Sequence, residues 1–236
     1  MGSHDEELTV LVTGFGPFGE QQSVNPSWEI ARNLPSSLPR TERGPRVRIV
    51  VHPEAIRVSY DVVRKLIPTL WDEDDEGKAR IDAAIHIGMA GPRPVYQLER
   101  RARRDGYRTP DVDGCLPAEE TCDDDDDNAI SQENKPSEIK TDLPLQSILQ
   151  AWRAATTPDM DLRISDDAGR FLCEYIYHAS LAHLLRNHRP RNVLFLHVPC
   201  HAAERYVKQG TELAVALVRA VADGVAGRAG RRLAGR

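Results

Sequence analysis

The chain is poor in cysteine, in aromatic side chains and in long apolar runs. Its 236 residues include four cysteines at irregular spacing, which are too few for a disulfide scaffold and fit a reducing compartment. No apolar run approaches the ~20 residues of a membrane span, and the first residues lack the pattern of a signal peptide. We therefore expect a cytoplasmic protein, located in the cytosol, with no membrane partner.

The chain also lacks an excess of positive charge. Lys and Arg number 31 and Asp and Glu 36, which gives a formal net charge of −5. Because phosphate binding needs a basic surface, this balance argues against a nucleic-acid partner. With 40% hydrophobic and 28% charged residues, the composition is that of a globular protein with a substantial core.

Short β-branched runs alternate with amphipathic segments. Strands are predicted over 8–13, 46–51, 81–87, 94–99, 162–165 and 192–198, with the strand at 94–99 more exposed than the others. Helices are predicted over 26–33, 59–70, 145–155, 168–187 and 204–225. This order predicts an α/β fold, namely a three-layer α/β/α sandwich with a mostly parallel twisted sheet, as in phosphorylases and hydrolases.

No segment has the composition of a linker, so we expect a single domain over residues 8–225. Residues 105–142 are loop-rich and contain an acidic insertion at about 115–137, where adjacent carboxylates at 123–127 predict a flexible surface loop. A calcium site there is disfavoured, because the alternating ligands and late Glu of a calcium loop are missing. Residues 226–236 are expected to form a frayed basic tail.

A glycine loop follows the first predicted strand. Its glycines match the pattern G-x-G-x-x-G: Gly14, Gly16 and Gly19. A dinucleotide site would need a helix to open inside this motif and an acid at the end of the second strand. Here Pro17 delays the helix to the N-cap Asn25, and the second strand ends without an acid. The glycines are better explained by a tight turn that presents Phe15 and Phe18.

A thiol and an imidazole are expected to meet at the carboxyl ends of the strands, where sites in open α/β sheets lie. Cys173 lies in the first turns of a predicted helix, where the helix dipole favours a thiolate, and His197 ends an apolar strand. They suit a nucleophile and its base, although both also suit buried structural residues. A third group should orient the imidazole, and the residues alone do not decide between Glu99, Asp166 and Asp167.

Two rival assignments involve the turn after this strand. Cys200 is a weaker nucleophile candidate, because it follows Pro199 on a turn and gains no helix N-terminus. A zinc site formed by His197, Cys200 and His201 is disfavoured, because a second ligand pair is missing. We therefore predict no metal.

Seven blocks of the sequence together carry a more specific signal. They are 12–19 (VTGFGPFG), 25–28 (NPSW), 87–91 (IGMAG), 98–100 (LER), 141–144 (TDLP), 164–173 (ISDDAGRFLC) and 196–199 (LHVP). Each is weak alone, but in this order they resemble the pyroglutamyl peptidase I family of cysteine peptidases. The resemblance spans about residues 8–217.

The resemblance implies a peptidase that removes an N-terminal pyroglutamyl (5-oxoprolyl) residue from peptides through a thioester acyl-enzyme. It implies that Cys173 is the nucleophile, that His197 is the general base and then the acid, and that Glu99 orients the imidazole. No cofactor is required. The expected partners are peptides with N-terminal pyroglutamate, and the sequence does not decide between a monomer and a homo-oligomer.

Substrate-binding residues follow from the same resemblance. Phe18 and Phe171 match family positions that hold the lactam ring, and the backbone near Met89 matches a loop that hydrogen-bonds it. Phe15 is a further candidate wall, and Asn25 belongs to the same N-terminal signature. A neutral lactam suits an apolar slot with aromatic walls and a few backbone partners.

Two alternatives stay open at this point. One is another α/β enzyme, such as a hydrolase or a nucleoside phosphorylase, since related sandwiches host other chemistry. The other is a non-catalytic relative that binds pyroglutamyl peptides. The presence of Cys173, His197 and Glu99 together argues against the second alternative.

Overall fold

The computed structural model describes residues 7–18, 23–42, 44–71, 80–118 and 136–234, with side chains up to residue 228. The strands are β1 (Glu7–Gly14), β2 (Ser37–Leu38), β3 (Arg46–Val51), β4 (Ala83–Met89), β5 (Val95–Glu99), β6 (Arg101–Arg103), β7 (Glu138–Lys140), β8 (Asp161–Ser165) and β9 (Val193–Val198). The helices are α1 (Pro26–Arg32), α2 (Tyr60–Trp71), α3 (Leu145–Ala154), α4 (Leu172–Arg186) and α5 (Glu204–Ala234).

Seven strands form the central sheet, in the order β2-β3-β1-β4-β9-β5-β8. The strands β3, β1, β4 and β9 run parallel to one another, whereas β5 pairs antiparallel with β9 and parallel with β8. The short edge strand β2 is antiparallel to β3. This mostly parallel sheet confirms the predicted α/β class.

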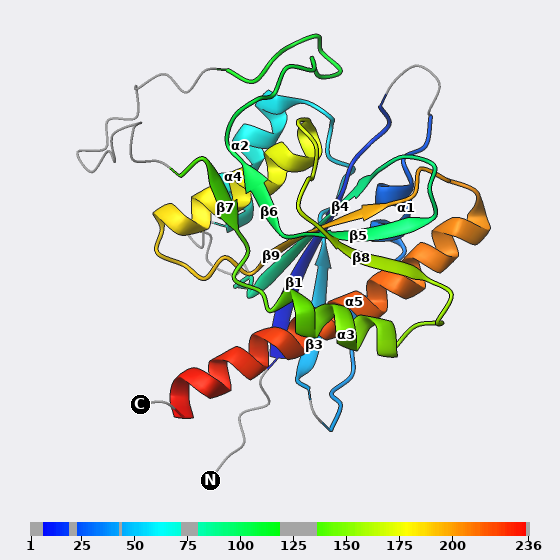
Figure 1. The fold of residues 1–236 in the computed structure, drawn as a ribbon, viewed down its shortest axis with the longest axis vertical. Helices are drawn as coiled ribbons and strands as arrows, with labels where there is room; N and C mark the ends of the chain where they lie inside the picture. The colour runs from blue at the N-terminus through cyan, green and yellow to red at the C-terminus, as the bar shows by residue number, and fades with distance from the viewer. Residues whose placement is uncertain (1–6, 19–22, 43, 72–79, 119–135, 235–236) are drawn as a thin grey trace.

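Helices cover both faces of the sheet, so the fold has three layers (Figure 1). The core on one face includes Ile30 of α1, Trp152 of α3 and Leu217 of α5. The core on the other face includes Val63 of α2 and Ile176 of α4. Buried strands such as β9, which is buried at every position, receive side chains from both layers.

Strand β5 differs from its prediction. The sequence predicts a more exposed strand, but Tyr96, Leu98 and Glu99 are all buried. The reason is topological: β5 lies between β9 and β8, inside the sheet rather than at its edge.

Two predicted helix boundaries are wrong. The prediction starts a helix at 168, but α4 begins at Leu172. Residues before it are held in turns, in which Ser165 Oγ accepts from Asp167 N at 3.1 Å and Asp167 Oδ1 accepts from Gly169 N at 3.3 Å. The closing helix was predicted to end at 225 before a frayed tail, but α5 continues to Ala234.

The loop-rich segment predicted over 105–142 contains a strand. Strand β7 pairs antiparallel with β6, with Arg103 opposite Glu138, and together they form a separate two-stranded sheet. The core of the predicted acidic insertion, including 123–127, lies outside the described residues. Within the described ranges, none of the helices is long and apolar enough to cross a membrane.

Candidate active site

His197 and Glu99 come from neighbouring strands of the central sheet. Strands β9 and β5 are antiparallel, with Gln97 opposite His197 and Glu99 opposite Phe195. Alternate residues share one face of a strand, so His197 and Glu99 project to the same side, diagonally across the pair. His197 Nδ1 lies 2.8 Å from Glu99 Oε1, and both side chains are buried. Sheet register therefore fixes the imidazole and its carboxylate together.

Glu99 is held independently of the imidazole. Its own carbonyl accepts a hydrogen bond from the Tyr177 hydroxyl at 2.9 Å, which joins β5 to α4. Among the described residues, the Oε2 atom of Glu99 has no hydrogen-bond partner, so His197 is the group that its carboxylate contacts. This arrangement suits a carboxylate that orients one ring and stabilises its protonated form.

The charge state of His197 follows from its partners. Burial would lower the pKa of His197, but the charge of Cys173 and hydrogen bonds with Cys173 and Glu99 outweigh it and raise the pKa to about 10. The ring also packs against Phe195, with ring centroids 4.8 Å apart. Both partners therefore favour the protonated imidazole, which is the form that can donate a proton.

Cys173 is the second residue of α4, at the N-terminus of a helix of 15 residues. Phe171 is the N-cap residue of α4, and its side chain makes no capping hydrogen bond. The first N–H groups of a helix have no acceptor within the helix, and the helix dipole places partial positive charge there. The thiol therefore lies where an anionic sulfur, or an anion formed next to it, is stabilised.

Gly88 provides the room for this sulfur. It lies on β4 directly opposite His197 in the sheet. A Cβ atom added at Gly88 would lie 2.9 Å from Cys173 Sγ and 2.6 Å from Cζ of Phe195. A side chain at this position would therefore displace the thiol or the ring that supports the imidazole.

The glycine loop after β1 is fixed by the start of α1. Asn25 is the N-cap of α1 and accepts from Ser27 N at 3.1 Å, while its amide donates to the carbonyl of Gly16 at 2.9 Å. Ser27 Oγ in turn accepts from Phe15 N at 3.0 Å. Phe15 is only 3% exposed and packs in the core with Ile56. Phe15 and Asn25 are thus buried and fix the shape of the loop that carries Phe18.

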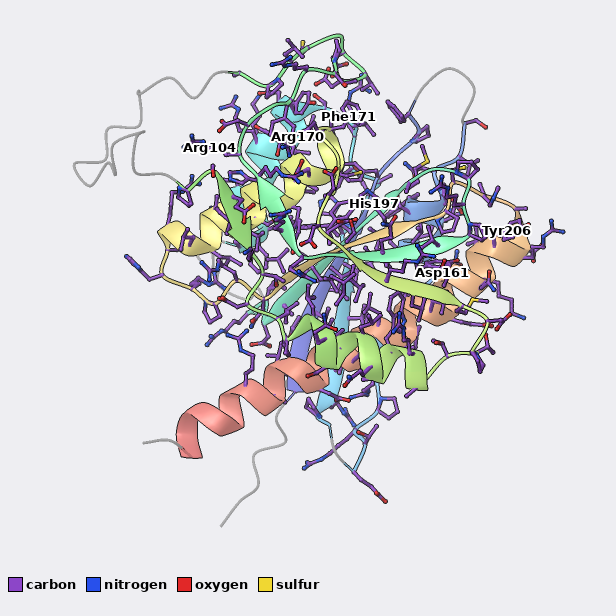
Figure 2. The ribbon with its side chains drawn as sticks, viewed as in Figure 1. Arg104, Asp161, Arg170, Phe171, His197 and Tyr206 are labelled. Carbon is purple, nitrogen blue, oxygen red and sulfur yellow. The ribbon has the colours of Figure 1, made fainter. Side chains whose placement is uncertain are left out.

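An aromatic pair lies beside the nucleophile candidate. Phe18, which is 38% exposed, has its ring centroid 5.2 Å from that of Phe171. Phe171 also contacts Tyr60 edge to face, at 6.1 Å. Figure 2 shows Phe171 next to Arg170 where the chain approaches α4. Met89, the half-buried last residue of β4, lies in register with Val198, the residue after His197.

The rival residues lie elsewhere. Asp166 and Asp167 form ion pairs with arginines, including Arg100 with Asp166 at 3.4 Å and Arg103 with Asp167 at 2.7 Å. His201 points away toward the carbonyl of Pro92, at 3.0 Å. In the part of the chain that the structure describes, no group of three or more His, Cys, Asp or Glu residues could hold a metal ion.

A cavity of about 230 Å³ lies on the other face of the sheet. Its lining includes Tyr96, Val198 and Tyr206, and Tyr206 is labelled in Figure 2. Tyr96 and Val198 belong to the core that α1, α3 and α5 cover, whereas Phe195 beside His197 belongs to the opposite core. This cavity therefore does not contain the cysteine–histidine pair.

Sequence reasoning missed two contributors to the site. Gly88 was noted as part of a loop but not as the residue that makes room for the thiol, since this contact joins elements far apart in sequence. Glu174, next to Cys173, is fully buried and pairs with Arg103 and Arg170. Its position beside the nucleophile candidate was the available signal, but a glutamate in a first helical turn is normally explained by the helix dipole.

The fold and these side chains define a class of protein. A thiol at a helix N-terminus, an imidazole whose charge responds to that thiol and a carboxylate behind the imidazole, on an α/β sandwich, are the parts of a cysteine peptidase. The sequence model of the pyroglutamyl peptidase family matches residues 8–226. The chain belongs to this family.

Individual relatives agree with this assignment. Pyroglutamyl-peptidase 1 of Rattus norvegicus is 31% identical over 191 residues, covering 80% of this chain and 78% of the relative. Pyrrolidone-carboxylate peptidase of Chromobacterium violaceum is 33% identical over 192 residues, covering 81% and 77%. The crystal structure of pyroglutamyl peptidase I from Bacillus amyloliquefaciens matches with a TM-score of 0.68 and 26% identity, covering 92% of this chain and 96% of that one.

Proposed function

We propose that this protein removes the N-terminal pyroglutamyl residue from peptides, with Cys173 as nucleophile, His197 as general base and acid, and Glu99 as the orienting carboxylate. The observation that carries the proposal is the position of His197, whose Nδ1 lies 2.8 Å from Glu99 Oε1 and whose pKa is raised by the neighbouring Cys173 and Glu99. Membership of the pyroglutamyl peptidase family supports the substrate class.

The first half of the reaction is acyl transfer to sulfur. The Cys173 thiolate attacks the pyroglutamyl carbonyl carbon, and the carbonyl oxygen becomes an oxyanion. Uncapped N–H groups at the start of α4 are suited to stabilise it. The C–N bond then breaks, protonated His197 gives its proton to the leaving amine, and a thioester with Cys173 remains.

The second half returns the enzyme to its starting state. With its proton gone, His197 accepts a proton from water as the water oxygen attacks the thioester carbonyl. The C–S bond breaks, pyroglutamate leaves, and the proton returns the Cys173–His197 pair to its resting charge. Glu99 stays ionised and holds the ring in one orientation through both steps.

The lactam ring is uncharged, so its recognition needs no ion pair. We place the ring against the Phe18–Phe171 pair, which is apolar and next to the nucleophile. The backbone at the end of β4, near Met89, supplies hydrogen bonds to the lactam amide by analogy with the family. Phe15 and Asn25, which the resemblance also places among the substrate-binding residues, hold the glycine loop that carries Phe18.

The reaction requires a reduced thiol. Cys115, Cys173 and Cys200 are all free, which suits the reducing cytosol that we propose as the location of the protein. Peptides with an N-terminal pyroglutamate are the proposed partners.

The test is release of fluorophore from pyroglutamyl-aminocoumarin under reducing conditions. We expect activity in the wild type and in Cys200→Ser, and only background activity in Cys173→Ser. Mass spectrometry of a quenched reaction should find the pyroglutamyl group on the peptide that contains Cys173. A folded, reduced wild type without activity would refute the proposal and favour a non-catalytic binding protein.

A further inference from the structure

We propose that Glu174 is a positioning residue that fixes the aromatic wall of the lactam site through Arg170 and Arg103. This inference rests on the proposed function, because it concerns how the same site holds its substrate. Glu174 follows the nucleophile Cys173 but points into the protein, where its side chain is 0% exposed.

The Glu174 carboxylate joins three segments. Its Oε2 atom accepts from the Arg170 guanidinium at 2.8 Å, in the loop that leads to Phe171. Its Oε1 atom accepts from the backbone N–H of Arg103 on β6 at 3.0 Å and lies 3.5 Å from the Arg103 guanidinium. One buried carboxylate thus connects α4, the loop before it and the small β6–β7 sheet.

Arg103 extends this connection to the far end of the same loop. Its guanidinium donates to Asp167 Oδ1 at 2.7 Å and to the carbonyl of Asp166 at 3.2 Å. The charges of Arg103 and Arg170 are balanced by those of Glu174 and Asp167. The loop over 166–171 is therefore held at both ends. Among Arg103, Asp167, Arg170 and Glu174, only Glu174 has a fully buried side chain.

Arg170 is confined on its other side by the backbone. Gly106 has a φ of +95°, and a Cβ atom there would lie 2.9 Å from Arg170 Nε. Arg170 therefore lies between Gly106 and Glu174. Since Phe171 is the next residue and contacts Phe18 at 5.2 Å, the position of Arg170 limits where this aromatic pair can lie.

The environment of Glu174 makes stability a weak explanation for this ion cluster. Burial raises the pKa of Glu174, although Arg170 and Arg103 both act to lower it. The charged carboxylate thus carries a desolvation cost, and buried ion pairs are often no more stabilising than apolar replacements. Precise placement of the neighbouring loop is an effect that a measurement of the free energy of unfolding would not detect.

The test compares Glu174→Gln and Arg170→Gln with Glu29→Gln. Glu29 is a matched control, because it also forms an ion pair with an arginine, Arg32, but lies on α1, on the opposite face of the sheet from α4. We expect KM for pyroglutamyl-aminocoumarin to rise about 10-fold or more in both test variants, as expected for misplacement of binding groups, with kcat changed much less. The inhibition constant of 2-pyrrolidone, a lactam ring alone, should rise in parallel.

Alkylation by iodoacetamide separates this role from a general loss of structure. It needs the Cys173 thiolate but no lactam site, so its rate should stay at the wild-type value in Glu174→Gln. The rate is read at Cys173 by peptide mass spectrometry, because Cys115 and Cys200 are also free. Arg170→Gln changes a side chain that is 40% exposed, so this variant keeps the test valid if Glu174→Gln does not fold.

The outcomes distinguish the two proposals. In the double variant, the KM effect should be smaller than the product of the two single effects, because both substitutions break the same Glu174–Arg170 contact. Unchanged KM in folded variants, or a loss of alkylation equal to the loss of activity, would overturn the role of Glu174. An inactive wild type would refute the peptidase function itself, and this is measured before any variant.

Discussion

The substitution Gly88→Ala offers a direct test of how closely the thiol is packed. The added Cβ atom would lie 2.9 Å from Cys173 Sγ, whereas a comfortable contact is ~3.7 Å. The sulfur must therefore move by ~0.8 Å, unless β4 itself shifts. A 1 Å misplacement of a reacting group costs about 100-fold in rate. Scaled to this shift, kcat should fall roughly 40-fold, or about 2.2 kcal/mol in activation free energy.

A second route leads to the same loss. The added atom would also lie 2.6 Å from Cζ of Phe195, whose ring packs against His197 at 4.8 Å. Movement of Phe195 would therefore displace the imidazole instead of the thiol. The overpacking should also lower the free energy of unfolding by about 1–3 kcal/mol, which most domains tolerate at 25 °C.

The assay is kcat on pyroglutamyl-aminocoumarin for protein that circular dichroism shows to be folded. Gly91→Ala is the control, because a Cβ atom at Gly91 meets nothing within 4 Å and the residue follows the same strand. We expect the control to keep wild-type kcat. A folded Gly88→Ala with wild-type kcat would refute the close packing of Cys173 against β4, and an equal loss in Gly91→Ala would mean that the effect is not steric.

The remaining predictions concern charge, acid stability and the glycine loop. In Cys173→Ser the pKa of His197 should fall well below about 10, because the charge of Cys173 is lost; a ring titration by NMR that finds no change would contradict the pairing. Burial lowers the pKa of His86 to about 3, against ~6.5 when unfolded, so its contribution to stability is full above pH 6.5 and is lost as the pH falls toward 3. Urea unfolding at pH 7 and pH 4 should therefore differ more in the wild type than in His86→Gln, by up to ~3 kcal/mol, and equal differences would exclude His86 as the cause. Asn25→Ala should lower the free energy of unfolding by about 1 kcal/mol or more, since it removes a helix cap and a bond to Gly16; a kcat loss without any change in stability would instead indicate direct contact with substrate.

Most of the fold could be predicted from local sequence, because β1, β3, β4 and β9 are apolar runs bounded by turns. Strand β5 could not be placed, since its burial depends on lying between β9 and β8. The start of α4 was predicted too early, because the turns formed by Ser165 and Asp167 look like a helix N-terminus in sequence. Propensity describes neighbours along the chain, and these features depend on neighbours in space.

The candidate site could be predicted only in part, because some of its contacts also depend on neighbours in space. Cys173 and His197 could be proposed from their places at a helix start and a strand end. Glu99 could not be chosen over Asp166 from residue type, because the choice depends on the antiparallel register of β5 and β9. Phe15 is predicted as a wall of the site, and the structure adds that it packs against Ile56 in the core, which residue type alone could not show.

The pairing of β6 with β7 has a consequence for how this protein can vary. Arg103 and Glu138 face each other across the two strands, so the long stretch of chain between them begins and ends at one place. The entropic cost of closing such a loop grows only with the logarithm of its length. A change in the length of this stretch therefore adds little to the cost of closing it and leaves the pairing of β6 with β7 in place.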